Sequence, residues 1–279
     1  MTTETRDQHA RPGEPVMSLR GITKRFGAVQ ALSGIELDVY PGEVVALVGD
    51  NGAGKSTFVK ILAGVYTPDE GTITFDGERV TIPSPGAAQQ LGISSVFQDL
   101  ALADNLDVVA NLFLGREITH GVLDEEEMER RSWELLRQLS ARIPSVRIPI
   151  ASLSGGQRQT VAIARSLIGD PKVVILDEPT AALGVAQTAE VLNLVERLRE
   201  RGLGVILISH NLADVQAVAD RVAVLRLGRN NGTFRMKDVT YEEIIAAITG
   251  ATDNAVTRRA ATRGTPAQEA ATNEGEVER

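Results

Sequence analysis

The sequence predicts an α/β protein with a parallel central sheet, and three observations support this. Residues 44–48, 173–176 and 205–208 are continuous apolar runs of strand length, the pattern of parallel strands that are buried on both faces. Apolar residues at helical spacing occupy the intervening chain, for example residues 186–201. A glycine-rich segment joins the first run to a helix. We expect one large domain over residues 16–249.

The composition is that of an ordinary globular protein. Hydrophobic residues make up 43% of the 279 residues, and the formal charge is −8 without any marked cluster of Lys and Arg. Nothing therefore indicates direct binding of a nucleic acid. The chain has no cysteine, which fits a reducing compartment. It shows no apolar run of membrane-spanning length and no signal peptide, so we expect a cytoplasmic chain whose membrane role comes through a partner.

The first elements are predicted to be antiparallel strands. Residues 1–15 are polar and are expected to form a disordered lead-in. A strand-like stretch runs from Val16 to Phe26, and residues 35–39 alternate apolar and polar side chains. Phe26 has two interpretations at this stage: an exposed ring that stacks on a base, or a half-buried strand aromatic.

The glycine-rich segment has the spacing G-x-x-x-x-G-K-[ST]. Its residues are Gly49, Asp50, Asn51, Gly52, Ala53, Gly54, Lys55 and Ser56, followed by Thr57. In this pattern backbone N–H groups surround a phosphate chain, the lysine reaches the β and γ oxygens, and the serine hydroxyl meets Mg²⁺. The helix that follows directs its free N–H groups at the same phosphates. We predict a nucleoside-triphosphate site, against the alternative of an ordinary glycine-rich turn.

The middle of the chain is predicted to add a helical subdomain. A short hairpin at residues 72–77 and a short helix at 86–91 lead to a strand that ends at Gln98. Beyond Gln98 the pattern becomes helical, and residues 125–139 carry their apolar side chains on one face. We assign residues 99–155 to this inserted subdomain.

Two carboxylates follow the second apolar run. Asp177 and Glu178 lie at the carboxyl end of a predicted parallel strand, where such sheets bind ligands. Carboxylates there are costly unless they hold a cation or a reacting water. Adjacent strand residues face opposite ways, so the two side chains should have different roles.

A histidine follows the third run at the same sheet edge. For an isolated histidine a satisfied core position is the usual interpretation, but the place of His210 beside the Asp177 strand favours a functional role. A closing hairpin at residues 221–236 and a helix at 241–249 complete the expected domain. Residues 250–279 show no periodicity and are expected to form a disordered tail.

Taken together, these motifs resemble the ATP-binding cassette family over roughly residues 16–249. The order matches: an aromatic, the phosphate-binding loop, a strand ending in Gln, Leu-Ser-Gly-Gly-Gln at residues 153–157, Asp-Glu, and a strand-end His. The resemblance implies a P-loop NTPase (RecA-like) core, a small antiparallel β subdomain and the inserted helical subdomain. It also implies two cassettes that dimerise head to tail around two ATP molecules.

The resemblance also implies residue roles. Phe26 would stack on adenine, residues 49–57 would hold the phosphates, and Ser56 would be a direct Mg²⁺ ligand. Lys55 belongs with the catalytic residues. From the neighbouring chain, the ATP would be contacted by Ser154, Gly155, Gly156 and Gln157. Taken alone, this last segment is also explained as ordinary helix-capping chemistry.

The remaining roles concern Mg²⁺ and the attacking water. Gln98 would sense Mg²⁺ and the γ-phosphate, and Asp177 would hold Mg²⁺ through water. Glu178 would polarise the attacking water, and His210 would contact the γ-phosphate. This division agrees with phosphoryl transfer, in which positioning and charge neutralisation carry the catalysis. One departure is Gly184, where the family usually has Asp, which leaves a cross-subunit contact open.

A narrower resemblance is to the ATPases of bacterial monosaccharide importers, carried by residues 49–56, 111–117, 153–159 and 180–185. It implies a homodimer on two membrane permease subunits, peripheral on the inner face of the cell membrane. An extracytoplasmic solute-binding protein would complete the system, and ATP with Mg²⁺ would be the cofactors. Uptake of a fructose- or ribose-type sugar is the implied function.

Three alternatives remain at this stage. An importer ATPase for a non-sugar solute fits the same motifs. A soluble cassette ATPase of DNA repair or translation fits poorly, because repair members insert long coiled coils and translation members carry two cassettes with a basic linker. An unrelated kinase or GTPase would have no role for Leu-Ser-Gly-Gly-Gln.

The segment after Gln98 has an apolar character of its own. Its apolar residues indicate either a docking groove for a permease or packing inside the helical subdomain; they are Leu100, Leu102, Leu106, Val108 and Val109.

Overall fold

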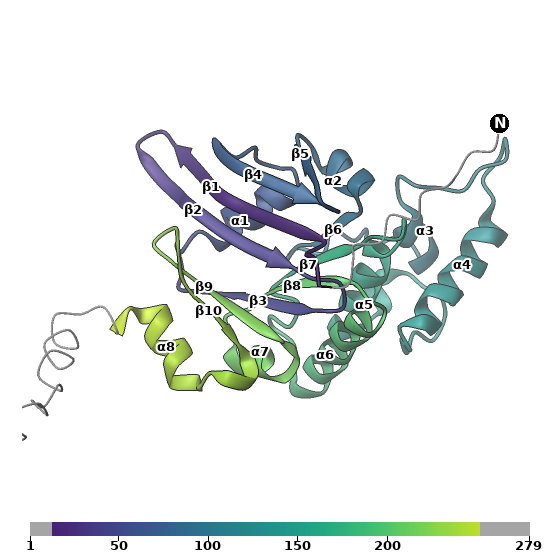
Figure 1. Ribbon diagram of the computed structural model, residues 1–279. Coiled ribbons are helices and arrows are strands. Elements are labelled where there is room, and N and C mark those ends of the chain that lie inside the picture. The colour runs from purple at the N-terminus through teal and green to yellow at the C-terminus, as the bar shows by residue number, and fades with distance from the viewer. Residues whose placement is uncertain (1–12, 252–279) are drawn as a thin grey trace, which may run out of the picture.

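The computed structural model describes residues 13–251, and the fold is built from two sheets with helices around them (Figure 1). The expected disordered lead-in, residues 1–15, and tail, residues 250–279, fall almost wholly outside the described residues. None of the helices within 13–251 combines the length and the apolar character needed to cross a membrane.

The smaller sheet has four strands in the order β2-β1-β4-β5, all antiparallel. This confirms the antiparallel opening of the chain. The hairpin predicted around Asp76 and Gly77 joins β4 to β5. The strands are β1 (Met17–Phe26), β2 (Val29–Val39), β4 (Glu70–Phe75) and β5 (Glu78–Val80).

The larger sheet has six strands in the order β10-β9-β3-β8-β7-β6. The pairs of β3 with β8 and β9, and of β7 with β6 and β8, are parallel, while β9 and β10 form an antiparallel hairpin. The three apolar runs therefore lie side by side as β3, β8 and β7. The strands are β3 (Val44–Val48), β6 (Ile93–Val96), β7 (Val173–Asp177), β8 (Gly204–Ile208), β9 (Arg221–Arg226) and β10 (Arg229–Arg235).

The central strands β3, β7 and β8 carry continuous apolar runs because each face of the large sheet meets a different core. On β7, Val174 and Leu176 pack toward the helices, whereas Val173 and Ile175 pack toward the small sheet and helix α1 (Lys55–Leu62). Figure 1 shows the small sheet and α1 on one side of the large sheet. On the other side lie α5 (Gly155–Ser166), α6 (Val185–Glu200), α7 (Leu212–Val218) and α8 (Tyr241–Thr249).

The segment at residues 99–155 is less helical than expected. It contains α3 (Val108–Phe113), α4 (Glu125–Gln138) and a short 3₁₀ turn (Ile150–Ser152), joined by long loops. The buried Asn111 explains how one loop holds its shape: its amide donates to the backbone oxygens of Ala103, Leu106 and Asp107 and accepts from the Ala103 N–H. A side chain thus satisfies backbone groups that a helix would have satisfied internally.

The other differences between the predicted and the observed elements concern short helices and strands. Helix α7 was not predicted, because its seven residues offer barely two turns of apolar spacing. Strand β10 begins at Arg229, earlier than expected. Helix α2 (Pro85–Leu91) and helix α8 agree with the expected short and final helices.

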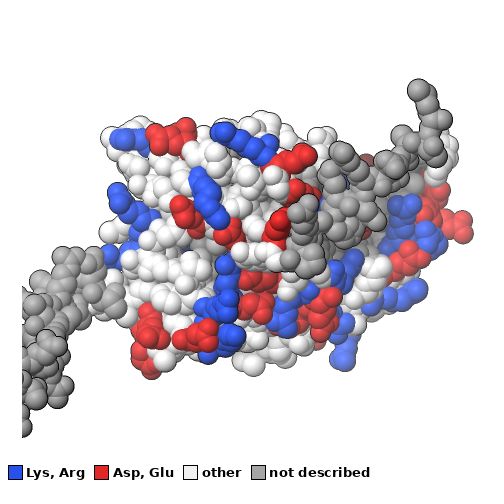
Figure 2. Space-filling view, viewed as in Figure 1, with Lys and Arg blue, Asp and Glu red and all other residues white. Residues whose placement is uncertain are grey.

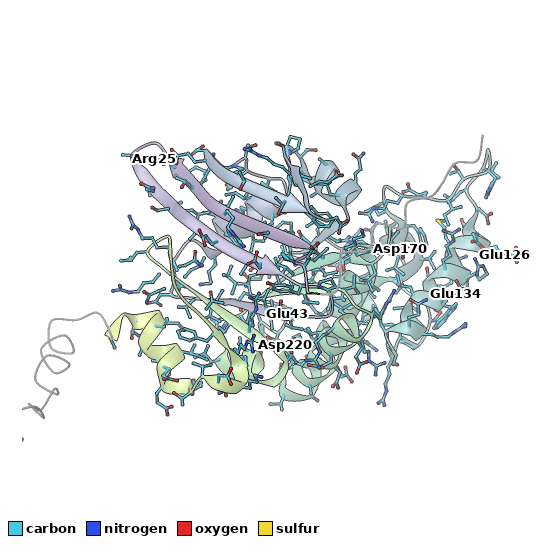
Figure 3. The ribbon with its side chains drawn as sticks, viewed as in Figure 1. Arg25, Glu43, Glu126, Glu134, Asp170 and Asp220 are labelled. Carbon is cyan, nitrogen blue, oxygen red and sulfur yellow. The ribbon has the colours of Figure 1, made fainter. Side chains whose placement is uncertain are left out.

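Charged side chains of both signs are interspersed on the face shown in Figure 2. One cluster links the two sheets at the amino ends of the parallel strands, where Figure 3 places Glu43 and Asp220 near each other. Arg221 pairs with Glu43, and its guanidinium lies 5.2 Å from the Tyr40 ring. Burial raises the pKa of Glu43, and the charge of Arg221 opposes that rise. Because the candidate site lies at the opposite, carboxyl ends, this cluster is structural.

Candidate active site

The phosphate-binding loop leaves β3 and enters α1 through glycines that no other residue can replace without displacement. Gly49 and Gly54 have φ angles of 151° and 104°, in the region that favours glycine. A Cβ on Gly49 would lie 2.2 Å from the Leu225 carbonyl oxygen, and one on Gly54 would lie 2.6 Å from a Leu32 methyl. Because α1 begins directly after Gly54, its first N–H groups have no intrahelical partner and can bind an anion.

Lys55 turns back over this loop. Its ammonium donates to the backbone oxygens of Gly49 at 2.6 Å and Asp50 at 3.1 Å. Burial lowers the pKa of Lys55, while the charges of Glu178, Asp50 and Asp177 oppose the decrease. The Lys55 ammonium is therefore bound to the loop, within the electrostatic influence of the two carboxylates.

The carboxylates differ in surroundings, as the sequence predicts. Asp177 is the last residue of β7, and burial, followed by the nearby charge of Glu178, raises its pKa. The charges of Lys55 and Lys60 oppose this rise. Glu178 lies just beyond the strand with a φ of 52°, a left-handed conformation that side chains seldom adopt.

Glu178 and His210 are brought together from neighbouring strand ends. The His210 Nδ1 atom lies 2.7 Å from the Glu178 Oε2 atom, and the His210 backbone N–H donates to the same oxygen at 3.4 Å. The Glu178 N–H in turn donates to the Ile208 carbonyl at 2.9 Å. A carboxylate with this support can orient a water molecule at a fixed place.

Glu178, His210 and the first residues of the glycine-rich loop line one cleft of about 510 Å³, whereas Lys55 and Asp177 do not line it. Most of its lining residues were predicted, whereas Ser209, Leu212 and Ile248 had no local sequence signal. The lining consists of Val48, Gly49, Asp50, Asn51, Gln98, Glu178, Ser209, His210, Leu212 and Ile248. The cleft thus combines the glycine-rich loop with Gln98, Glu178 and His210, which follow strands β6, β7 and β8.

Phe26 is 42% exposed at the end of β1. Its ring meets the Tyr66 ring edge-on at a centroid distance of 5.2 Å, and the Lys24 ammonium lies 5.7 Å from its centroid. This exposure leaves the aromatic surface accessible for stacking. The adenine contact remains a prediction.

The Ser154 segment does not line the same cleft. Ser154 caps α5, where its hydroxyl accepts from the Gln157 N–H and the Gln157 side chain accepts from the Ser154 N–H. Both residues line a second cleft of about 690 Å³ beside α6. Gly156 also has a packing role, since a Cβ there would lie 3.1 Å from the Gln187 Cβ. Within one chain, this segment and the phosphate-binding loop face different spaces.

The residues present fit Mg²⁺ held jointly with a nucleotide. Mg²⁺ prefers oxygen ligands, keeps several waters and usually binds through one or two carboxylates plus phosphates. Within the described part of the chain no group of three or more acidic, His or Cys residues forms a complete cage. The family resemblance assigns the ion to the Ser56 hydroxyl, to Gln98 and, through water, to Asp177.

We predict two opposite effects for Asp177→Asn. Folding raises the pKa of Asp177, so its ionisation lowers the free energy of unfolding as pH rises through that pKa. The neutral variant should therefore be more stable than the parent at pH 7 without nucleotide, and this difference should disappear at pH values below about 3.9. Conversely, Mg²⁺ should enhance nucleotide binding less in the variant.

Thermal unfolding at several pH values and nucleotide titrations with and without Mg²⁺ measure both effects. If the variant gained stability but Mg²⁺ still enhanced its nucleotide binding fully, Asp177 would not be a ligand of the metal ion.

Comparisons with known proteins agree on one family. The ABC transporter family model matches residues 32–181. The fructose import ATP-binding protein FrcA of Rhizobium meliloti is 45% identical over 247 residues, or 85% of this chain and 95% of the relative. The xylose/arabinose import ATP-binding protein XylG of Sulfolobus acidocaldarius is 43% identical over 235 residues, or 84% and 94%.

Solved structures show the same fold. The ADP conformation of MJ1267, an ATP-binding cassette of an ABC transporter, superposes with a TM-score of 0.74 at 28% identity, covering 84% of this chain and 95% of that one. The dimeric structure of MJ0796, a bacterial ABC transporter cassette, gives a TM-score of 0.68 at 26% identity, covering 79% and 98%.

Proposed function

The chain belongs to the ABC transporter family, and from this membership we propose that it is the ATP-hydrolysing subunit of an importer that carries a sugar across a membrane. ATP binding and ATPase activity are general to the family. The observation that supports the proposal best is the single cleft that joins the phosphate-binding loop to Gln98, Glu178 and His210. Such a set of groups suits hydrolysis of a bound nucleoside triphosphate.

We assign the phosphates to residues 49–57 and the adenine ring to Phe26. When a triphosphate binds, Lys55 can exchange two neutral carbonyl acceptors for charged phosphate oxygens, which form stronger hydrogen bonds. Mg²⁺ would neutralise charge on the phosphates, held by Ser56, by Gln98 and, through water, by Asp177. Of the residues in these assignments, Gly49, Asp50, Asn51 and Gln98 line the cleft.

Glu178 is assigned to the attacking water. Its Oε2 atom is occupied by His210, which leaves the Oε1 atom to accept a hydrogen bond from water in the cleft. His210 lies beside it at the wall of the cleft, where it would contact the γ-phosphate. Removing the His210 ring should lower turnover more than ATP affinity, because Glu178 loses its support.

We further propose that each complete site is shared by two copies of the chain, arranged head to tail. The Ser154 segment faces a different cleft from the phosphate-binding loop of its own chain, and α5 begins there with free N–H groups. A second copy could bring those groups to the phosphates of the first. At Gly184, the N-cap of α6, the chain has no side chain to make the cross-subunit contact for which the family usually has Asp, and the next residue, Val185, is 91% exposed.

We propose that the transported solute is a sugar, because the names of the two relatives above state import of fructose and of xylose or arabinose. A permease would place the chain at the inner face of the membrane, with a solute-binding protein outside. An importer of a different solute is the alternative. Uptake by cells or vesicles that carry this chain with its permease, tested on a panel of sugars and amino acids, separates these functions; ATP-dependent uptake of amino acids alone would reject the sugar assignment.

The surface that would receive the permease is a cleft of about 340 Å³ next to Gln98. Its walls combine the apolar residues Leu112 and Leu114 with Arg116 and Arg165. Arg165 donates to the Leu100 oxygen at 2.6 Å, which joins the loop after Gln98 to α5. We call this the coupling cleft, because a segment docked there would touch the loop that carries Gln98.

The apolar residues proposed from the sequence for this groove need correction. Val108 and Val109 are fully buried in the core, where α3 packs on its neighbours, so packing is the right interpretation for them. Leu102 is half-buried against the same core. Only Leu100 of the original five lines the coupling cleft.

We predict that Leu114→Glu uncouples ATP hydrolysis from uptake. Leu114 is 49% exposed in the coupling cleft, so a charge there should repel an apolar partner without disturbing the core. Val122→Glu is the matched control, since Val122 is 77% exposed and does not line the cleft. Two quantities are measured for each variant: sugar uptake by the assembled transporter, and the ATPase rate of the isolated chain. Equal uptake by the two variants and the parent would exclude this docking site.

A further inference from the structure

A buried carboxylate outside the assigned site joins the two loops that carry Glu178 and His210. Asp214 is 6% exposed. Its Oδ2 atom accepts from the Thr180 hydroxyl at 2.6 Å, and its Oδ1 atom accepts from the Asn211 amide at 3.0 Å. No ion pair of the described residues includes Asp214. A buried carboxylate is costly unless it is hydrogen-bonded, so both bonds matter.

The Thr180 bond is a second link between the chain around Glu178 and the chain around His210. Thr180 lies two residues after Glu178, and Asp214, in helix α7, lies four residues after His210. The Glu178 loop is therefore held to the end of β8 by the Glu178 N–H and the Ile208 oxygen at 2.9 Å, and to α7 by Thr180 and Asp214.

Glu178 needs such anchoring because its backbone is strained. Its φ of 52° is left-handed, and a residue with a Cβ keeps that conformation only where its surroundings impose it. The turn that follows is tight, since the Ala181 N–H donates to the Glu178 oxygen at 3.1 Å. Losing the Thr180 anchor would leave only one side of this turn tied to the neighbouring loop.

We propose that Asp214 is a positioning residue for ATP hydrolysis: by holding Thr180, it keeps Glu178 in the backbone conformation that faces His210 and the cleft. The inference rests on the role of Glu178 proposed above. Asp214 itself touches neither nucleotide nor water and acts through Thr180.

The simpler alternative is that Asp214 only stabilises α7. It stands in the first turn of that helix, where a negative charge is favourable, and Asn211 caps the helix by accepting from the Ala213 N–H. This alternative explains the hydrogen bond between Asn211 and Asp214, but under it the loss of the Thr180 hydroxyl should not affect ATP turnover. Changes at Thr180 therefore separate the two interpretations.

The decisive variant is Thr180→Val, which keeps the shape of the side chain and removes the hydroxyl donor. We expect kcat for ATP to fall between about ten-fold and a hundred-fold, because a small misplacement of a catalytic group has effects of that size. KM and directly measured ATP affinity should stay within about two-fold, because the phosphate-binding loop is untouched. Thr180→Ser, which restores the hydroxyl, should recover most of the turnover.

Two further variants complete the experiment. Thr74→Val removes a hydroxyl from strand β4 of the small sheet, at a residue that does not line the cleft, and should leave kcat unchanged. Asp214→Ala, which removes the acceptor of the Thr180 hydroxyl, combined with Thr180→Val should lower kcat no further than the more damaging single change, since each single change already breaks that bond. If Asp214→Ala fails to fold, the Thr180 series still tests the positioning role.

The outcomes also separate this inference from the proposed function. Normal kcat in Thr180→Val, or a loss that Thr180→Ser does not repair, would overturn the positioning role while Glu178→Gln remains inactive. Full activity of Glu178→Gln and His210→Ala in the same assay would instead reject the site assignments themselves.

Discussion

Replacing Glu178 by glutamine should lower ATP turnover by about 10²- to 10⁴-fold while ATP still binds, the range that loss of a general base produces. Glutamine keeps the size of the side chain and an oxygen that can accept from His210, but it loses the negative charge that polarises water. The structure makes this a clean substitution, because the Glu178 backbone is held through its own N–H and the Ile208 oxygen.

The measurements are the rate of phosphate release and the affinity for ATP under the same conditions. Glu78→Gln on the exposed strand β5 is the matched control and should be indistinguishable from the parent. Full turnover by Glu178→Gln would mean that another group orients the water. A parallel fall in ATP affinity would point to a role in binding rather than in the chemical step.

Mixing two variants that cannot retain ATP should restore one ATP-retaining site in each mixed dimer. The variants are Lys55→Ala, which damages the phosphate-binding loop, and Ser154→Arg, which damages the start of α5, both in a Glu178→Gln background that retains bound ATP. Each homodimer should trap no ATP, whether sites are shared or not. In the mixed dimer, a shared site pairs the intact loop of one chain with the intact Ser154 segment of the other.

Different affinity tags on the two variants allow mixed dimers to be purified in two steps, and the readout is ATP retained per dimer. A shared site predicts about one ATP per mixed dimer, because both defects fall in the second site. Ser154 also caps α5, so its loss costs about 1 kcal/mol and the variant must be shown to fold. Purified mixed dimers that retain no ATP would contradict the shared site and favour sites built within one chain.

The sequence alone was sufficient for the elements that repeat a local pattern. The runs that became β3, β7 and β8 were recognised because strands buried on both faces are apolar at every position, and the two cores on either side of the large sheet explain that requirement. The glycine-rich loop was predicted from its spacing, and the structure explains why glycine is needed there, since a Cβ on Gly49 or Gly54 would collide with neighbouring atoms. Asp177 and His210 each come at the end of a predicted parallel strand, so the sequence also placed them at the same edge of the sheet.

The sequence was misleading where a side chain replaces a regular pattern. The apolar residues at 99–155 suggested helix, yet much of this segment is loop, and Asn111 satisfies one loop by itself. Nothing near Asn111 marks it as different from an exposed residue. Helix α7 was missed because two short turns give too few positions to show a period.

Local sequence therefore determined which segments form strands and which loop has the glycine spacing expected of a phosphate-binding loop, since each depends on neighbours a few positions apart. Only the tertiary structure decided how those residues meet. The Glu178–His210 contact spans 32 residues and the Thr180–Asp214 hydrogen bond spans 34. Both arise because β7 and β8 are adjacent in the sheet, and pairing between distant strands leaves no periodic trace in either segment.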